Sequence, residues 1–274
     1  MALRRRAAAG LQAGRAAAID LRRFSRRQLE RMAGAGREVA ECESVLAKTG
    51  DTVVGELLRH QPFFEWDHYP AGEVFDPETQ ALYYYHAHPS EQRDAEEHGH
   101  FHTFIRAIDL PQEIRPLPLP TCDAEGEVSG LAHLVAIAVD AEGTAYRLFT
   151  TNRWVTGESW YRAQDLIRLL ELFHVGHARP SWPANRWITA MLTLFRPQVI
   201  MLLEERDRTV AAWAKSHPES PVTEDRRLEI VTSLRISLIE QRRAVDAALA
   251  ERAPAPDTPE IPRDGVLPAP VKRS

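Results

Sequence analysis

Residues 81–108 read ALYYYHAHPSEQRDAEEHGHFHTFIRAI, and this stretch decides the fold. Its two ends, residues 81–88 and 100–108, are rich in aromatic and apolar side chains, and histidines recur in them at every second position. Because side chains alternate between the two faces of a strand, this spacing predicts two β-strands. The eleven residues at 89–99 suit a long hairpin loop that pairs the two strands antiparallel.

Further strands are expected on either side of this pair. The same strand-like pattern recurs at residues 65–69, 131–139 and 144–151, so residues 63–151 are predicted to form an antiparallel sheet of about five strands. Residues 140–143, Asp-Ala-Glu-Gly, predict a hairpin turn between the last two strands, because glycine adopts positive φ readily.

Helical periodicity flanks the strand region on both sides. Ser25 and Gln28 have the spacing of a capping box, which predicts a helix from there to Ala47, followed by a short helix that ends near residue 58. After the sheet we expect four helices, the third with Pro197 in its first turn and the fourth capped by Thr223. These helices are predicted at residues 160–174, 184–195, 197–215 and 224–250.

Strands in one block between two blocks of helices predict an α+β fold in a single domain, residues 25–251. In this arrangement the N-terminal helices occupy residues 25–58, and a C-terminal helical layer at 160–250 covers one face of the sheet. The histidines are expected on the other face.

The composition excludes several classes of protein. The 274 residues carry a net charge of −5, which argues against a general nucleic-acid binder. Two cysteines exclude a disulfide scaffold and fit a reducing cytoplasm, and no apolar run is long enough for a membrane span. Residues 1–24 are predicted to be a basic flexible arm that contacts an acidic partner, and residues 252–274 a proline-rich disordered tail.

Histidine is the anomaly, because six of the eleven histidines lie between residues 68 and 102. If strands 81–88 and 100–108 pair, four imidazoles project from one sheet face, close enough to reach one ion. Neutral imidazole binds divalent transition metals such as zinc and iron. The predicted metal ligands are therefore His86, His88, His100 and His102, with His68 and His98 as a second tier.

Three residues near these histidines are candidates for catalysis. Glu97 closes the acidic loop and supplies the carboxylate of a two-histidine, one-carboxylate site. Arg153 and Glu158 follow the last predicted strand, where loops often carry binding residues. Arg153 would bind the carboxylate or phosphate of a small-molecule ligand, and Glu158 would act as a base or ligand. In the alternative interpretation, Thr156 or Ser159 only caps the next helix.

Residues 98–104, HGHFHTF, resemble the signature of the histidine-triad nucleotide hydrolases and transferases. The resemblance implies that His100, the middle histidine, attacks a phosphorus atom of the nucleotide. The chain departs from that family in three ways, one of which is the absence of the family's upstream Gln-Ser/Thr-Val context. Gly99 stands where the family prefers a bulky apolar residue, and about 170 residues follow a motif that the family places near its C-terminal end.

Two hypotheses for the histidines therefore stand beside the triad. In the first, the protein is a metal-binding protein or a metal-dependent enzyme that acts on a small molecule. In the second, it is a non-enzymatic regulatory or interaction protein whose histidines form a polar face. Crowded imidazoles would also resist joint protonation, which would make such a face respond to pH.

Four motifs together resemble a proteobacterial family that is described as a domain of unknown function. They are HYP at 68–70, YYHAH at 84–88, EHGHFHTF at 97–104 and NRWVTGE at 152–158. The resemblance covers about residues 25–250 and implies a bacterial, cytoplasmic protein. It assigns no activity, cofactor or catalytic residue.

Overall fold

A six-stranded antiparallel sheet forms the centre of the fold, and its strands lie side by side in chain order. The computed structural model describes residues 19–59, 61–107, 114–119 and 130–252. The strands are β1 (Tyr69–Phe75), β2 (Ala81–His86), β3 (Gly99–Arg106), β4 (Leu131–Val139), β5 (Ala145–Thr151) and β6 (Ile230–Arg235).

The pairing of β2 with β3 confirms the predicted hairpin. The strands run antiparallel, with Tyr84 opposite His102 and His86 opposite His100. The turn between β4 and β5 is also confirmed, since the Asp140 N–H donates to the Thr144 carbonyl at 3.0 Å. Gly143 in this turn has a φ of +79°, which glycine adopts without a side-chain clash.

Two helices precede the sheet, as predicted. Helix α1 (Arg26–Ala47) begins at the capping box, in which Ser25 accepts from the Gln28 N–H and Gln28 accepts from the Ser25 N–H. Helix α2 (Val53–Leu58) follows, capped by Thr52.

Five helices follow β5, and β6 lies between the last two of them. They are α3 (Arg153–Thr156), α4 (Ala163–Leu170), α5 (Trp182–Leu194), α6 (Arg196–Ser216) and α7 (Leu238–Ala250).

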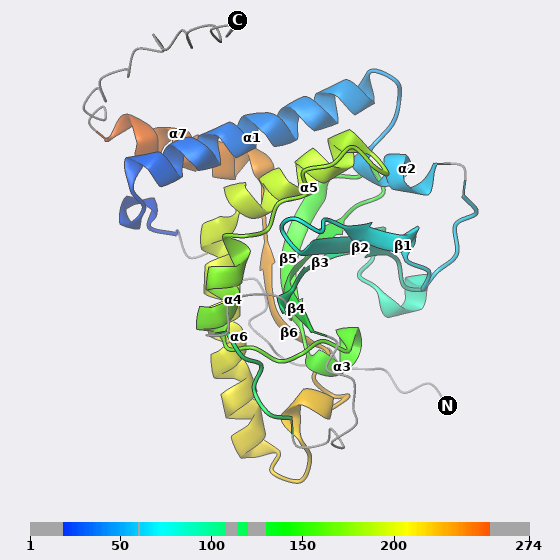
Figure 1. Cartoon of the computed structure of the whole chain (residues 1–274), viewed down its shortest axis with the longest axis vertical. Helices are drawn as coiled ribbons and strands as arrows, with labels where there is room; N and C mark the ends of the chain where they lie inside the picture. The colour runs from blue at the N-terminus through cyan, green and yellow to red at the C-terminus, as the bar shows by residue number, and fades with distance from the viewer. Residues whose placement is uncertain (1–18, 60, 108–113, 120–129, 253–274) are drawn as a thin grey trace, which may run out of the picture.

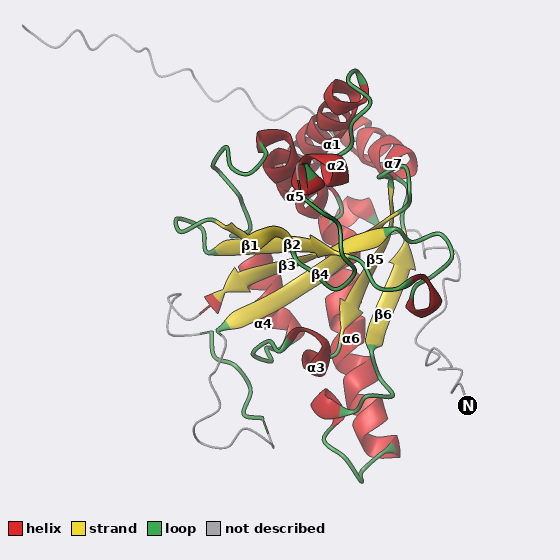
Figure 2. Cartoon of the chain, turned by 90° about the vertical axis from the view of Figure 1, so that its right-hand side faces the viewer, coloured by secondary structure: helices red, strands yellow, loops and turns green. Residues whose placement is uncertain are grey.

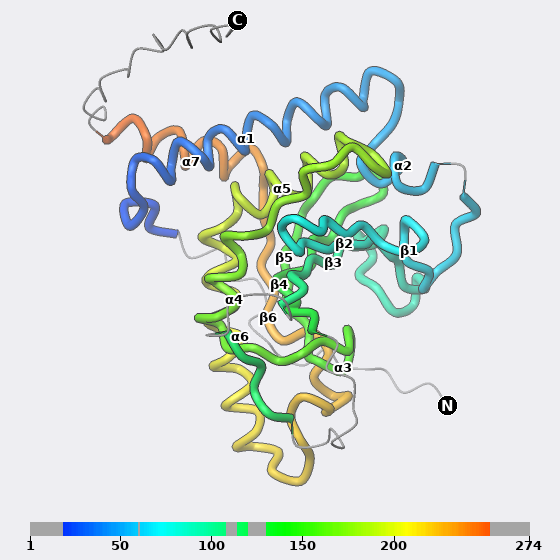
Figure 3. Tube along the Cα trace, in the orientation of Figure 1, coloured from blue at the N-terminus to red at the C-terminus, as the bar shows by residue number. Residues whose placement is uncertain are grey.

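The helices gather on one side of the sheet, which confirms the α+β fold. Helices α4, α5 and α6 lie on that side, whereas the short α3 lies on the other (Figure 1). In Figure 2 the strands fan out side by side from β1 to β6, with α1, α2 and α5 above β1 and β2 and with α4 and α6 behind the sheet. Helices α1 and α7 come from opposite ends of the chain, yet they pack together, as the trace in Figure 3 shows.

Alternate residues of the central strands point into the core beneath the helices. Tyr83 and Phe101 are fully buried, and the Phe101 ring lies 5.3 Å from that of Trp187 on α5. The residues between them, which include the histidines, point to the opposite face. That face is not open, because His86, His100 and His102 are all buried.

The expected helix at residues 224–250 is wrong. Its first half forms β6, and the helix α7 begins only after Ser237, which accepts from the Glu240 N–H as a new cap. Leu228, Val231 and Leu234 are spaced as in a helix, but the β-branched run at 230–232 completes the sheet beside β5. The sheet therefore has six strands. Thr223 lies in a short 3₁₀ turn, Val222–Glu224.

Other boundaries also differ from the prediction, and β2, for example, ends at His86 and not at His88. The first strand begins at Tyr69 and includes only the last of the predicted residues 65–69, because Trp66 has a φ of +73° that interrupts an extended backbone. Helix α4 is shorter than the predicted 160–174, and it begins after Arg162 without a side-chain cap. Neither Thr156 nor Ser159 caps it.

The two ends of the chain lie largely outside the described residues. Of the predicted basic arm, the structure shows a 3₁₀ turn at Leu21–Arg23, in which Leu21 is buried. The predicted proline-rich tail is described only at Arg252. Among the described helices, none combines the length and hydropathy that a membrane span requires.

Gly99 provides a test of the β2–β3 register. A Cβ atom there would lie closer than any real Cβ contact to the Tyr85 hydroxyl and the His86 carbonyl oxygen. We expect Gly99→Ala to lower the free energy of unfolding by about 2 kcal/mol, because overpacking forces the two strands apart. Urea unfolding measures this difference. Gly34→Ala, where the added methyl meets only ordinary contacts in α1, should not destabilise. Equal stability of both variants would contradict the register.

Candidate metal centre

Three buried imidazoles converge on the sheet face opposite the helical layer. His86 ends β2, and His100 and His102 lie on β3. One ring nitrogen from each lies within 4.8 Å of the others. The Nε2 atoms of His86 and His100 are 2.7 Å apart. In a tetrahedral site with metal–nitrogen bonds of about 2.0–2.1 Å, neighbouring ligand nitrogens are about 3.3 Å apart. The His86–His100 separation is shorter than this value, and 4.8 Å is the upper limit for all three nitrogens.

Glu97 fixes the orientation of His100. Its Oε1 lies 2.6 Å from Nδ1 of His100, and Arg147 of β5 donates to Oε2. Burial alone would raise the pKa of Glu97, but His100 and Arg147 outweigh it and hold the pKa at about 2. The ionised carboxylate can only accept, so His100 carries its proton on Nδ1. The Nε2 atom of His100 therefore faces the other histidines, 2.7 Å from Nε2 of His86.

A second chain of contacts supports His102. Its Nδ1 lies 2.9 Å from Nε2 of His133 on β4, which leaves Nε2 of His102 to serve as a ligand. The backbone N–H of His133 donates to Oε2 of the buried Glu158 at 2.7 Å. Burial raises the pKa of Glu158 to about 8, although the nearby Arg206 acts in the opposite direction. Glu158 thus anchors strand β4 at His133 through this backbone hydrogen bond.

His86, His102 and His133 are held in the neutral form, in which a ring nitrogen can bind a metal. Burial, and secondarily the neighbouring His100, lower the pKa of His86 to about 2. Burial also lowers the pKa of His102 well below its usual range, and burial together with Arg206 lowers that of His133 to about 3. Removal from water disfavours the charged imidazolium, so the ring lone pairs stay available at neutral pH.

A cavity of about 70 Å³ is lined by two of the three histidines, His100 and His102, whereas His86 does not line it. It holds only a few non-hydrogen atoms, since a water molecule in the liquid takes about 30 Å³. Charged residues from the loop before β3 and from β5 line one side, and the segment around α3 and the start of β6 lines the other. The other lining residues are His88, Gln92, Arg93, Asp94, Glu97, Arg147, Phe149, Thr151, Val155, Glu229 and Ile230.

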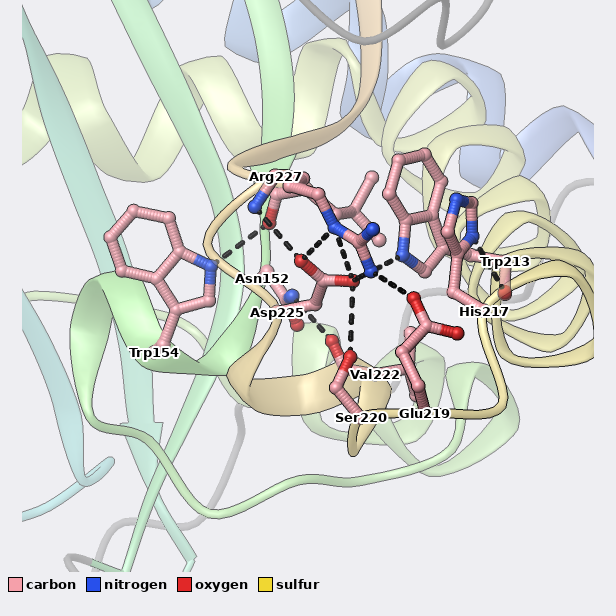
Figure 4. A network of polar contacts seen from close by, with 10 residues as sticks. Asn152, Trp154, Trp213, His217, Glu219, Ser220, Val222, Asp225 and Arg227 are labelled. Atoms are coloured by element: carbon pink, nitrogen blue, oxygen red, sulfur yellow. Dashed lines mark hydrogen bonds and ion pairs between the residues drawn. The ribbon is translucent and has the colours of Figure 1, made fainter.

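The wall formed by α3 is held by a polar network (Figure 4). The Asn152 side chain donates to the Val222 carbonyl at 2.8 Å, and the Trp154 indole donates to the Leu228 carbonyl at 2.9 Å. Asp225 accepts from the Trp213 indole and from Arg227 in the same loop. The NRWVTGE segment thus anchors the loop that leads to β6 against one side of the cavity.

The other predicted ligands, His88, His68 and His98, are not part of this group of three converging ring nitrogens. His88 is close, with its ring centroid 5.2 Å from that of His100 and stacked on Trp66. His68 stacks on Tyr84 and contacts Glu73 at 2.9 Å.

His98 is separated from His100 and His102. Its Nδ1 lies 2.5 Å from the hydroxyl of Tyr85, a residue of the helix-covered face, and its ring stacks on Phe63. The expected alternation fails there because β3 begins only at Gly99. This arrangement gives the histidine-triad alternative no support, since that alternative needs all three imidazoles together.

The predicted catalytic candidates take different positions. Glu97 lines the cavity and contacts His100, as described above. Arg153 pairs with Glu224 at 2.5 Å and donates to the Glu158 backbone carbonyl at 3.1 Å. Arg153 and Glu158 are not among the residues that line the cavity. Both therefore stabilise the segment around α3 in this structure.

Arg147 is the residue that the sequence pattern did not indicate. It contacts Glu97 and lies 2.9 Å from an oxygen of Asp94. Only 12% of its side chain is exposed. Its one signal was a cation in the otherwise apolar strand at 145–151, because a buried charge requires a partner.

The lowered histidine pKa values predict that the metal-free protein loses stability in acid. The unfolded chain takes up protons as the pH falls below 6.5, whereas His86 and His133 stay neutral in the folded state, with pKa values of about 2 and 3. The free energy of unfolding is therefore highest above pH 6.5, and it decreases as the pH falls because only the unfolded chain takes up these protons. Each of the two histidines should lower the free energy of unfolding by about 1 kcal/mol between neutral pH and pH 5.5.

Urea unfolding at pH 7.5 and 5.5 measures this loss. His133→Gln should reduce it by about 1 kcal/mol. His174→Gln replaces an exposed histidine and should leave it unchanged. If His133→Gln and the parent lose the same stability, His133 is charged in the folded protein and this description of the site is wrong.

The chain matches the family model of a domain of unknown function, DUF6969, over residues 33–236. This range contains the entire sheet and the three converging histidines. No match was found among curated proteins or among solved structures. Membership of a family of unknown function, which the four motifs predicted, is confirmed. Because the match covers more than half of the chain, the protein belongs to the DUF6969 family.

Proposed function

We propose that the protein binds one divalent transition metal ion, zinc or iron, through His86, His100 and His102. We further propose that this ion serves a metal-dependent enzyme that acts on a small molecule. The observation that carries both proposals is the convergence of the three buried ring nitrogens within 4.8 Å of one another, beside a small cavity. His88 is close enough to contribute from the cavity side.

The donor set favours zinc or iron over calcium and magnesium. Imidazole nitrogen suits the transition metals, whereas calcium and magnesium prefer oxygen ligands. Three protein ligands are typical of catalytic zinc sites, which keep a fourth position for water or substrate. An ion in that state acts as a Lewis acid and lowers the pKa of bound water.

The surrounding residues prepare the ligands for this role. Glu97 holds His100 in the tautomer that directs Nε2 at the other imidazoles, and Arg147 holds the carboxylate ionised. A histidine ligand that donates its other N–H to a carboxylate is both oriented and made more basic. The cavity lined by His100 and His102 is the place for the small molecule.

Metal analysis of untagged protein tests the first proposal. We expect close to one zinc or iron per chain after purification or reconstitution, and a sharp loss of metal in His100→Ala and His102→Ala. Bound metal should also raise the melting temperature of the parent, because a ligand of the native state stabilises it. His174→Ala, an exposed histidine on another part of the chain, should retain the metal.

Parent protein that stays metal-free, with a melting temperature unchanged by zinc or iron, would refute metal binding. Equal metal content in His100→Ala and His174→Ala would show that the metal is bound elsewhere and not by the proposed ligands.

Glu97→Gln tests the orienting role of the carboxylate. Loss of a partner that orients a histidine ligand typically weakens metal affinity 10–100-fold, and we expect an effect of about that size. Competition with a chromophoric chelator measures it. Glu96→Gln is the matched control, since the neighbouring Glu96 is exposed and pairs with Arg235 at 2.8 Å. If both variants retain the parent's affinity, Glu97 has no part in positioning His100.

A further inference from the structure

A second and larger cavity, of about 120 Å³, lies in the helical layer. It is enclosed by the first turns of α1, the end of α4 and the junction between α5 and α6. None of its lining residues lines the histidine cavity. They are Gln28, Arg31, Met32, Leu170, Glu171, Phe173, Leu192, Thr193 and Arg196.

Hydrogen-bond donors dominate the polar side of this cavity. The Oε1 atom of Gln28 accepts from the backbone N–H and the hydroxyl of Ser25, so its Nε2 is the atom left to bind a ligand. Nε of Arg196 is buried and has no hydrogen-bond partner in the part of the chain that the structure describes. Arginine can donate but cannot accept.

The charges in the cavity are not balanced. Arg196 pairs with Glu171, which is the single carboxylate among the lining residues. The exposed side chain of Arg31 makes no ion pair or hydrogen bond with any residue of the described ranges, so no carboxylate of these ranges neutralises it. Burial lowers the pKa of Arg196. Glu171 opposes this effect, and the neighbouring Arg31 adds to it, as expected for two guanidinium groups that repel each other. An anion between them would relieve the repulsion.

The rest of the lining is apolar. Met32 and Leu192 are almost fully buried, and Leu170 and Phe173 complete this side. A ligand that fits must therefore combine an anionic head with an aliphatic part. The volume is about four times that of a water molecule in the liquid, which limits the ligand to a short chain.

We propose that this cavity binds a small carboxylate with a short aliphatic chain. The carboxylate lies between Arg31 and Arg196, where guanidinium groups offer charge-assisted hydrogen bonds, and the chain lies against the apolar side. This site is separate from the histidines and does not depend on a bound metal.

Isothermal titration of the full chain with butyrate tests this proposal, with butyramide as the neutral analogue of the same shape. We expect butyrate to bind and butyramide not to bind. Arg31→Ala should weaken butyrate binding about tenfold, the effect of losing one charge-assisted hydrogen bond. Arg31 is exposed on α1, so its replacement should not unfold the protein. Arg27→Ala, an exposed arginine one turn earlier that does not line the cavity, should bind like the parent.

Three results would overturn the proposal. They are the absence of butyrate binding, equal binding of butyrate and butyramide, and equal weakening in Arg27→Ala and Arg31→Ala. The same titration is also carried out with inorganic phosphate. If phosphate binds at this site and butyrate does not, the assignment of an aliphatic carboxylate is wrong.

Discussion

The antiparallel pairing of β2 with β3 is the constraint on which the candidate centre depends. It places His86 opposite His100, with His102 two residues farther along the same face. Gly99 permits this register, because a side chain there would collide with Tyr85. A slip by one residue would turn the histidines into the apolar core beneath the helices. The register of one strand pair therefore determines whether the three ring nitrogens meet.

Buried polar groups are costly unless they find partners, and this face of the sheet buries several. Arg147 holds Glu97, Glu97 holds His100, and His100 contacts His86. A second set of polar contacts links His102 to His133. These contacts join four strands, so the imidazoles are positioned before any ligand arrives. Such preorganisation is what a metal site or an active site requires of its supporting residues.

Much of the fold and part of the centre could be predicted from local patterns. Alternation within 81–108 was sufficient to place His86 and His100 on one face of paired strands. Strand β6 was missed because Leu228, Val231 and Leu234 also fit a helical period, and only the free edge of β5 decides between the two. Arg147 could not be found either, because its contact with Glu97 spans 50 residues. No local pattern encodes such a pairing.

X-ray absorption at the zinc edge of the reconstituted protein tests the central claim most directly, because it reports the atoms bound to the metal. We expect three imidazole nitrogens at about 2.0–2.1 Å from the metal and one further light atom, from water or from His88. Replacement of His100 by alanine should remove one imidazole from this coordination shell. A shell of oxygen atoms alone, or one unchanged by this replacement, would contradict the claim that His86, His100 and His102 form a metal centre.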